Sequence, residues 1–177
     1  MKILDDDLYF AKLKPNAIIP NKKQEDAGYD LYACFEEDYF VIEAGCSRPV
    51  PTGIASAFSS KYYAQIEERS SMAKIGIKKS GGVIDSGYRG EYLVVLYNTR
   101  KLPFIISKID EENLPERIEV DGKVYNKNEV IIYPYKKAIC QIVMQIIPEL
   151  KVTEVTYEDL TSIESERGAG GFGHSGK

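Results

Sequence analysis

The segment ERSSMAKIG, Glu68–Gly76, places an arginine and two hydroxyls at what we expect to be the start of a short helix. Arg69, Ser70 and Ser71, together with the free backbone N–H groups of a helix start, are donors that a phosphate accepts from. Two ordinary interpretations compete: Ser70 as an N-cap and Arg69 as a surface ion pair. The segment alone therefore indicates an anion site without deciding for one.

A second segment, GGVIDSGYRGE at Gly81–Glu91, carries groups suited to nucleotide recognition. Backbone N–H and C=O groups beside Gly82 can read the edge of a base, and Tyr88 can lie flat against a sugar. Asp85, held near a metal-bound polyphosphate, can orient and deprotonate a water as a general base. The alternative is an aspartate in a hairpin turn with a tyrosine packed on the sheet.

Two further polar residues lie in strand-like surroundings. Asp30, in DAGYDLYA, is expected at the start of a strand just after a glycine turn, and Gln141 interrupts the apolar run AICQIV. A buried amide needs hydrogen-bond partners; its carbonyl can hold a metal-bound water, or the amide can bond to backbone.

The chain ends with ERGAGGFGHSGK, in which five of twelve residues are glycine. These glycines surround Arg167, Phe172 and His174, the one histidine of the chain. By composition alone this is a flexible end, because glycine loses much backbone freedom when it is ordered.

The elements that must position these residues are strands. Short apolar runs rich in Val, Ile and the 13 tyrosines alternate with turn residues at roughly ten-residue spacing, which favours a sandwich or jelly roll. SSMAKIGIKK alone predicts a short helix, and Asp121-Gly122 predicts a type I′ hairpin turn. Clear strand candidates are YDLYACF, YFVIEA, YYAQIEE, EYLVVLYN, RIEV, KVYN, EVIIYP and KKAICQIVMQII.

Composition limits the class of protein. The 177 residues, 44% apolar and 28% charged, fit one domain over residues 1–160, followed by an extended arm over 161–177. No signal peptide or apolar span is evident, so we expect a cytoplasmic protein that does not bind membranes. The net charge of −4 argues against a nucleic-acid surface, so an anionic ligand must be held locally or through a metal ion. Cys34, Cys46 and Cys140 are expected to be reduced packing thiols.

In this order, AGYDLYA, RSSMAKIG, GGVIDSGYRGE, AICQIV and RGAGGFGHSG resemble the five motifs of the trimeric deoxyuridine triphosphatase (dUTPase) family, across nearly the whole chain. The resemblance implies an all-β, distorted jelly roll (β-clip) with one short helix and a flexible C-terminal arm. It implies a homotrimer with active sites at subunit interfaces. The implied reaction is Mg²⁺-dependent hydrolysis of dUTP to dUMP and pyrophosphate, which keeps uracil out of DNA and supplies dUMP for dTMP synthesis.

The resemblance also implies residue roles. Asp85 matches the aspartate that activates the water attacking the α-phosphate, and Tyr88 matches the tyrosine that packs on deoxyribose. Gly82 and Val83 lie in the hairpin whose backbone pairs with uracil. The phosphate-contacting segment is matched by Arg69, Ser70 and Ser71, and the residues that hold the water shell of magnesium are matched by Asp30 and Gln141.

In the tail, Arg167 matches the phosphate-clamping arginine and Phe172 the aromatic that closes over the uracil. Gly173 lets the arm approach the nucleotide closely. His174 and Ser175 stand where the family usually has two hydroxyl residues; His174 either donates to the γ-phosphate or contributes its backbone alone. Two further departures are Glu68 in place of a proline, and Lys136-Lys137-Ala138 in place of Gly-Asp-Arg.

Length is the largest departure from the family pattern. Asp85 and Gln141 are 56 positions apart, and the surplus falls at about residues 101–130. Similar insertions occur in phage-type dUTPases, which implies a regulatory or protein-binding surface; the alternative is a hairpin that covers a sheet edge.

Two rival functions remain. The related dCTP deaminases use a glutamate where this chain has Val95, and a valine cannot shuttle a proton. The second rival is a non-catalytic module that presents the insertion to a protein partner.

Overall fold

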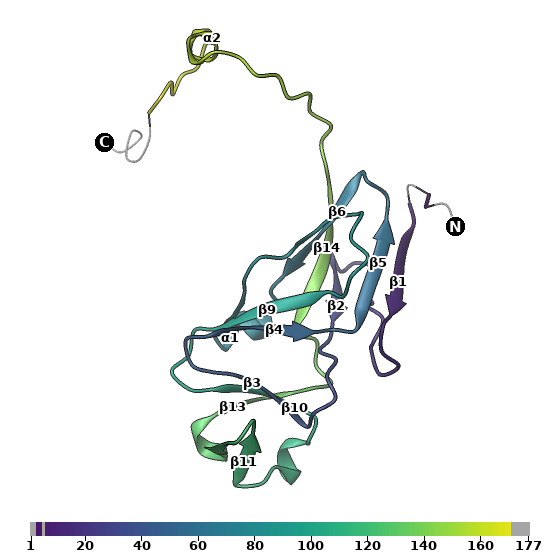
Figure 1. Ribbon diagram of the computed structural model, residues 1–177, viewed down its shortest axis with the longest axis vertical. Helices are drawn as coiled ribbons and strands as arrows, with labels where there is room; N and C mark the ends of the chain where they lie inside the picture. Colours follow the sequence, from purple (N-terminus) through teal and green to yellow (C-terminus); the bar gives the residue numbers. More distant parts are fainter. Residues whose placement is uncertain (1–2, 5, 171–177) are drawn as a thin grey trace. The chain divides into compact units, whose positions relative to one another are not determined.

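The computed structural model describes residues 3–4 and 6–170 (Figure 1). Contacts divide the chain into a β-rich unit that ends at Ile147 and a second unit that begins at Pro148. The boundary expected at residue 160 thus falls inside the second unit. Strands account for nearly all regular structure of the first unit, and the all-β prediction is confirmed.

Pairing organises these strands into several small sheets. One sheet has the order β2 (Gly28–Leu31), β14 (Cys140–Ile146), β6 (Tyr62–Glu67), β8 (Val83–Ile84), and all its pairs are antiparallel. A second has the order β4 (Ser47–Pro51), β9 (Leu93–Asn98), β7 (Ile77–Lys79), and a third β13 (Ile131–Pro134), β10 (Phe104–Ser107), β3 (Tyr39–Ile42). Two-stranded pairs are β1 (Leu8–Lys12) with β5 (Ile54–Phe58), and β11 (Arg117–Val120) with β12 (Lys123–Asn126).

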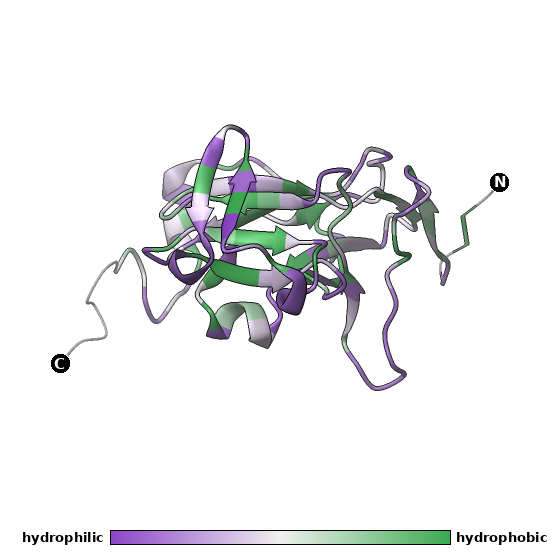
Figure 2. Ribbon diagram, turned by 90° about the horizontal axis from the view of Figure 1, so that it is seen from below, coloured by the Kyte–Doolittle hydropathy of each residue, from purple (hydrophilic) through white to green (hydrophobic). Residues whose placement is uncertain are grey.

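Strand β4 forms despite Pro49 and Pro51. It lies at the end of its sheet and pairs with β9 alone, so the missing N–H groups disturb no second partner. Figure 2 shows the strands as largely apolar and the connecting loops as largely polar. The main core lies between the sheets and includes Leu31, Ile54 and Ile142, each fully buried.

Strands β3 and β10 are apolar on both faces. Phe104 and Ile106 point into the main core, whereas Ile105 and its neighbour Val41 point to the other side. There Leu114 and Ile118 cover them and form a second, smaller hydrophobic cluster. Strand β10 is therefore the centre of a sheet, and the later part of the segment expected to be an insertion covers its outer face.

The added segment contains the hairpin β11–β12 and two single 3₁₀ turns, Glu111–Asn113 and Lys127–Glu129. Its tip, Asp121-Gly122, has φ angles of 51° and 75°, which confirms the predicted type I′ turn. The segment covers the outer face of β3 and β10, not a sheet edge.

Glu43 fastens this hairpin to the rest of the unit. Its Oε1 accepts hydrogen bonds from Lys123 Nζ at 2.7 Å and from Tyr125 Oη at 2.8 Å. These two donors lower the pKa of Glu43, while burial and the same carboxylate raise the pKa of Tyr125 to about 12. These contacts connect the β11–β12 hairpin to the chain directly after β3.

The predicted helix is α1, Ser70–Lys74, which ends before Gly76 with φ 79°. A second helix, α2 at Tyr157–Ser162, corrects the expectation of one helix. Thr156 caps it: its Oγ1 accepts from Asp159 N at 3.0 Å and donates to Asp159 Oδ2 at 2.7 Å. The sequence TYED contains this capping signal, which the glycine-rich context beyond Leu160 obscured.

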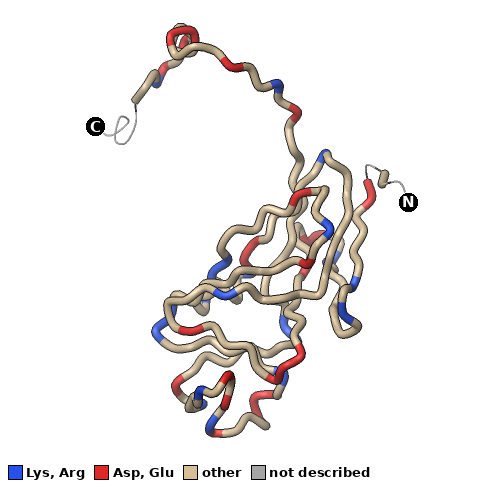
Figure 3. The backbone as a smooth tube through the Cα atoms, in the orientation of Figure 1, with Lys and Arg blue, Asp and Glu red and all other residues tan. Residues whose placement is uncertain are grey.

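Charges of both signs are interspersed along the backbone (Figure 3). Over residues 3–4 and 6–170, no helix combines the length and the hydrophobicity that a membrane span requires. Cys34 and Cys140 are buried, as expected, but Cys46 is exposed and does not pack.

Candidate active site

Three motifs of the sequence meet on one four-stranded sheet. Strand β14 lies between β2 and β6, and its Gln141 stands opposite Asp30 on one side and Glu67 on the other. Two residues beyond Glu67 the chain reaches Arg69 and enters α1. Cross-strand pairing thus brings together residues that are more than 100 positions apart in the sequence.

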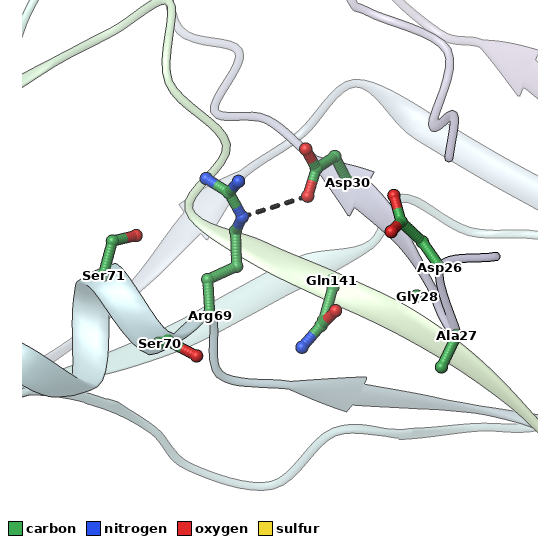
Figure 4. Close-up of a pocket in the computed structure, with 8 residues that line it drawn as sticks. All are labelled: Asp26, Ala27, Gly28, Asp30, Arg69, Ser70, Ser71 and Gln141. Atoms are coloured by element: carbon green, nitrogen blue, oxygen red, sulfur yellow. Dashed lines mark ion pairs between the residues drawn. The ribbon is translucent and has the colours of Figure 1, made fainter. Parts of the chain in front are cut away.

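These residues line a cavity of about 370 Å³ (Figure 4). Figure 4 shows Arg69 reaching towards Asp30, with Gln141 beside them and the two serines on the first turn of α1. Of the residues predicted from the sequence, five lie here: Asp30, Arg69, Ser70, Ser71 and Gln141. Asp26, Ala27 and Gly28 also contribute to the wall.

Arg69 is held by two acceptors. Its Nε forms a 3.0 Å ion pair with Asp30 Oδ1, and its Nη1 donates to the Ala138 carbonyl at 3.2 Å. The two charged side chains are 32% and 33% exposed, so solvent screens the pair and it contributes little stability. What the pair supplies is orientation: the remaining guanidinium N–H groups are free of these two acceptors.

The N-cap of α1 is Arg69, with φ −85° and ψ 144°, and no side chain caps the helix. Ser70 is therefore not the N-cap, and the interpretation that gave it that role is wrong. Both serine side chains are exposed on the first turn, where backbone N–H groups lack intrahelical partners. Guanidinium, hydroxyls and these N–H groups together form a donor-rich wall.

Gln141 is half-buried rather than buried. Its Nε2 donates to the Glu68 carbonyl at 2.9 Å, which supplies the predicted partner for the amide. Its Oε1 lies against Gly28, where a Cβ would collide with it. Gly28 therefore leaves the space that the amide occupies.

Glu68 faces away from this cavity. Its carboxylate accepts a hydrogen bond from the Lys79 backbone N–H at 3.3 Å, on strand β7, and it does not line the wall. The charge that the sequence places beside the candidate phosphate site is thus directed elsewhere.

The dUTPase family model matches residues 14–111. This chain belongs to the dUTPase family. A deoxyuridine 5'-triphosphate nucleotidohydrolase from Clostridium acetobutylicum is 33% identical over 174 residues, which are 96% of this chain and 97% of that protein. The Pol polyprotein of caprine arthritis encephalitis virus is 39% identical over 100 residues, but the matched part is 9% of that polyprotein.

Solved structures of phage dUTPases share the fold. The Staphylococcus bacteriophage 80alpha dUTPase with dUPNHPP superposes with a TM-score of 0.69 at 25% identity, over 97% of this chain and 99% of that one. The dUTPase of phage phi11 of S. aureus, whose structure shows a species-specific insert, gives a TM-score of 0.61 at 21% identity. The jelly-roll prediction and the phage-type likeness are confirmed.

The third dUTPase motif lies on the same sheet but away from the cavity. Strand β8 pairs with β6 at Ala64–Ile84, so the next residue, Asp85, stands level with Tyr63. Gln141 pairs at Glu67, four residues further along β6, which is about 13 Å at 3.3 Å per residue. Within one chain, Asp85 therefore does not line the cavity that holds Arg69.

Two glycines and a backbone hydrogen bond define the hairpin that carries Asp85. Gly81 and Gly82 have φ angles of 75° and 122°, and the Gly82 carbonyl accepts from Ile66 N at 2.7 Å. That carbonyl is thus already hydrogen-bonded within its own sheet, so fewer backbone groups near Gly82 are available to a base than the sequence predicts. Val83 is 63% and Tyr88 45% exposed.

Tyr88 is oriented by its neighbours. Its hydroxyl donates to the Glu91 carbonyl at 3.0 Å, and a Cβ on Gly90 would collide with its ring. Arg89 Nη1 donates to the Ser86 carbonyl at 2.6 Å and to the Tyr88 carbonyl at 3.0 Å. Tyr88 and Asp85 are both exposed on this loop.

The fifth dUTPase motif is described only in part. Arg167 belongs to the second unit, where its Nε donates to the Gly170 carbonyl at 2.7 Å. Phe172, Gly173, His174 and Ser175 lie outside the described residues.

Sequence reasoning missed Gly28 and Ala138, which contact the cavity residues Gln141 and Arg69. Gly28 lies within the quoted segment DAGYDLYA, two residues before Asp30 on the same face of the strand, and this spacing could have identified it. Ala138 contributes a backbone carbonyl to Arg69, and no residue pattern signals such a contact.

Proposed function

We propose that this member of the dUTPase family hydrolyses dUTP to dUMP and pyrophosphate at sites that two or more copies of the chain complete. The observation that carries the proposal is the cavity between β2, β14 and α1, where Arg69, Ser70 and Ser71 present hydrogen-bond donors beside Asp30. Such a donor set suits a phosphate chain far better than an apolar ligand.

The acceptor side of the cavity fits a magnesium ion carried by the triphosphate. Asp30 and Gln141 supply a carboxylate and an amide oxygen on neighbouring strands, and both are hard oxygen donors. Mg²⁺ keeps several of its waters in protein sites, so these two residues would hold it through water. When bound, the ion neutralises charge on the phosphate chain.

The residues of the chain divide the remaining work. Arg69, Ser70 and Ser71 bind phosphate oxygens, and Tyr88 packs on deoxyribose and thereby disfavours a ribose. Asp85 accepts a proton from a water, whose oxygen forms the new bond to the α-phosphorus while the bond to the departing pyrophosphate breaks. The backbone near Gly82 and Val83 recognises uracil.

The arm residues complete the site in this proposal. Arg167 contacts the phosphates, and Phe172 closes over the base. Gly173, His174 and Ser175 bring backbone and side-chain donors to the γ-phosphate, which excludes water from side reactions.

A shared site follows from the position of Asp85 relative to the cavity. Because Asp85 and Arg69 of one chain are directed to different places on the sheet, a neighbouring copy must supply one of them. A cyclic assembly of three copies satisfies this for every site at once, since each copy gives its hairpin to the next. The number of copies comes from the resemblance to the trimeric dUTPases, so the proposed assembly is a homotrimer.

The deciding assay is pyrophosphate release from dUTP, dCTP, dTTP and UTP, with Mg²⁺ and with excess chelator. We expect turnover of dUTP with Mg²⁺ and little turnover of the other three. Ammonia release from dCTP at a comparable rate would instead assign the chain to the deaminases. Asp85→Asn is expected to lower kcat by about 10²–10⁴-fold while dUTP still binds, because a general base contributes that much.

Sharing of sites has its own test. Asp85→Asn and Arg69→Ala chains, each inactive alone, are co-expressed at equal levels. Sites built from two copies should recover about one quarter of wild-type activity, because random cyclic trimers pair an intact Asp85 with an intact neighbouring Arg69 in that fraction. Recovery below a few per cent would place both residues of each site in one chain.

A further inference from the structure

Tyr133 lies behind the cavity, on an element that carries none of the recognised motifs. Strand β13 pairs in parallel with β10, and Tyr133 stands beside Ile106 in the core of the unit. The side chain is 6% exposed, and its ring packs against Phe104 at 5.7 Å between centroids. The ring packs in the hydrophobic core, whereas the hydroxyl has a polar partner.

The hydroxyl donates to the Ala138 carbonyl at 2.7 Å. Arg69 Nη1 donates to the same carbonyl oxygen at 3.2 Å. A carbonyl oxygen has two lone pairs, so it accepts both bonds. One atom of the backbone thus joins a buried phenol to the guanidinium that lines the cavity.

The Ala138 carbonyl takes its hydrogen bonds from two side chains, while the backbone on either side of it is bonded separately. It belongs to the loop between β13 and β14, which is closed at Lys137 N by the Pro134 carbonyl at 3.0 Å and at Ile139 N by the Leu31 carbonyl at 2.8 Å. Ala138, between these two bonds, has a methyl side chain that makes no polar contact of its own. The Tyr133 hydroxyl reaches across five positions to hold it.

The surroundings of the hydroxyl agree with this arrangement. Burial raises the pKa of Tyr133, and the neighbouring Ser71 hydroxyl and Arg69 guanidinium partly offset that rise. The phenol therefore stays protonated at neutral pH and acts as a donor. It lies beside both a serine and the arginine of the cavity wall.

We propose that Tyr133 is a positioning residue for the triphosphate site: through the Ala138 carbonyl it fixes the plane of the Arg69 guanidinium. Asp30 holds Nε and Ala138 holds one N–H of Nη1, which leaves three of the five guanidinium N–H groups for phosphate oxygens. With both acceptors the Arg69 guanidinium has one orientation. With Asp30 alone the guanidinium can rotate about its Nε contact. This inference rests on the proposed function of the cavity.

The test is Tyr133→Phe, which keeps the ring against Phe104 and removes the hydroxyl. The matched control is Tyr135→Phe. Tyr135 lies two positions after Tyr133, directly after the end of β13, and its hydroxyl neighbours Cys34 instead. Loss of one buried hydrogen bond should raise the KM for dUTP about five-fold, and kcat should stay within about two-fold because phosphate binding is the same in substrate and transition state. Tyr135→Phe should leave both constants near wild type.

A second readout does not depend on turnover. In the free protein, the Nε–H of Arg69 gives an NMR signal that Arg69→Lys removes and thereby assigns. Solvent exchange of this proton should quicken about five-fold in Tyr133→Phe and stay unchanged in Tyr135→Phe. Thermal unfolding of both variants by circular dichroism verifies that each is folded.

An unchanged solvent-exchange rate of the Arg69 Nε–H in Tyr133→Phe overturns the proposal. A rise in the KM for dUTP no larger than that of Tyr135→Phe also overturns it. A wild-type chain that does not hydrolyse dUTP refutes the proposed function separately, because the NMR comparison still reports whether Tyr133 holds Arg69.

Discussion

Gly28→Ala is expected to disturb the cavity from a position that carries no functional group. Gly28 pairs with Val143 and lies two residues before Asp30, so on the sheet it is the diagonal neighbour of Gln141. A Cβ added to it would lie 2.8 Å from Gln141 Cδ and 2.9 Å from Gln141 Cβ. Because Cβ is fixed to the backbone, rotating the side chain alone cannot relieve the contact, and the strands must move apart.

The size of the effect follows from three contributions. Overpacking of this kind destabilises by about 1–3 kcal/mol, and the displaced amide loses its bond to the Glu68 carbonyl, about 1 kcal/mol. Restricting the unfolded chain by Gly→Ala returns about 0.4–1 kcal/mol. The free energy of unfolding should therefore fall by about 2 kcal/mol, which for a chain of this length lowers Tm by about 4–8 °C.

The chain has 13 tyrosines and no tryptophan, so urea unfolding is best followed by far-UV circular dichroism. Gly87→Ala is a matched control, because no atom lies within 4 Å of its added Cβ and its φ is not positive. In a Gln141→Ala background, Gly28→Ala should cost about 1 kcal/mol less than in the wild type, since the amide and its bond to the Glu68 carbonyl are gone while the contact with the Cβ of residue 141 remains. Equal costs in both backgrounds, or wild-type stability and KM in Gly28→Ala, would refute the seating of Gln141 against Gly28.

Three further predictions concern the arm and the added segment. Truncation after Glu166 should remove most dUTP hydrolysis while the melting temperature of the β-rich unit stays within about 2 °C, because that unit ends at Ile147; wild-type turnover would make the arm dispensable. Glu43→Gln should make stability depend less on pH on the acid side. Because the pKa of Glu43 is lowered in the folded protein, its stabilising contribution is present above the ordinary value of 4.5 and is lost as pH falls further. The melting temperatures of the two proteins should therefore converge between about pH 6 and pH 3. Ile118→Ala should lower the free energy of unfolding by about 3 kcal/mol, since Ile118 is fully buried, yet leave kcat at 25 °C within about two-fold; a comparable loss of kcat would connect the hairpin to the cavity.

Local signals predicted much of this fold because the responsible forces are local. The Asp121-Gly122 turn requires positive φ at both positions, and the pair of residue types states this directly. Alternation and β-branched content likewise located the strands that pair around Gln141. The cavity residues followed because Asp30, Arg69 and Gln141 each belong to a short motif with its own chemical logic.

Other features depend on partners that are distant in sequence. Whether Pro49 and Pro51 permit a strand is decided by its place at the end of a sheet, which only the topology reveals. Phe104 and Ile106 lie within the segment expected to be an insertion and fill the main core, which no local signal indicated. The contact of Tyr133 with Ala138 involves a backbone carbonyl, which every residue has, so residue identity could not announce it.

The two-sided burial of β3 and β10 has a consequence for how relatives of this chain can differ. Val41 and Ile105 are apolar because Leu114 and Ile118 cover them, so their identities are tied to the presence of the hairpin. A homologue with a short connection at this point would expose both positions to water and should carry Thr, Ser or a charged residue there. Insertion and outer-face residues are thus expected to be inherited together, and a designed deletion of Leu114–Lys127 should succeed only when Val41 and Ile105 are made polar at the same time.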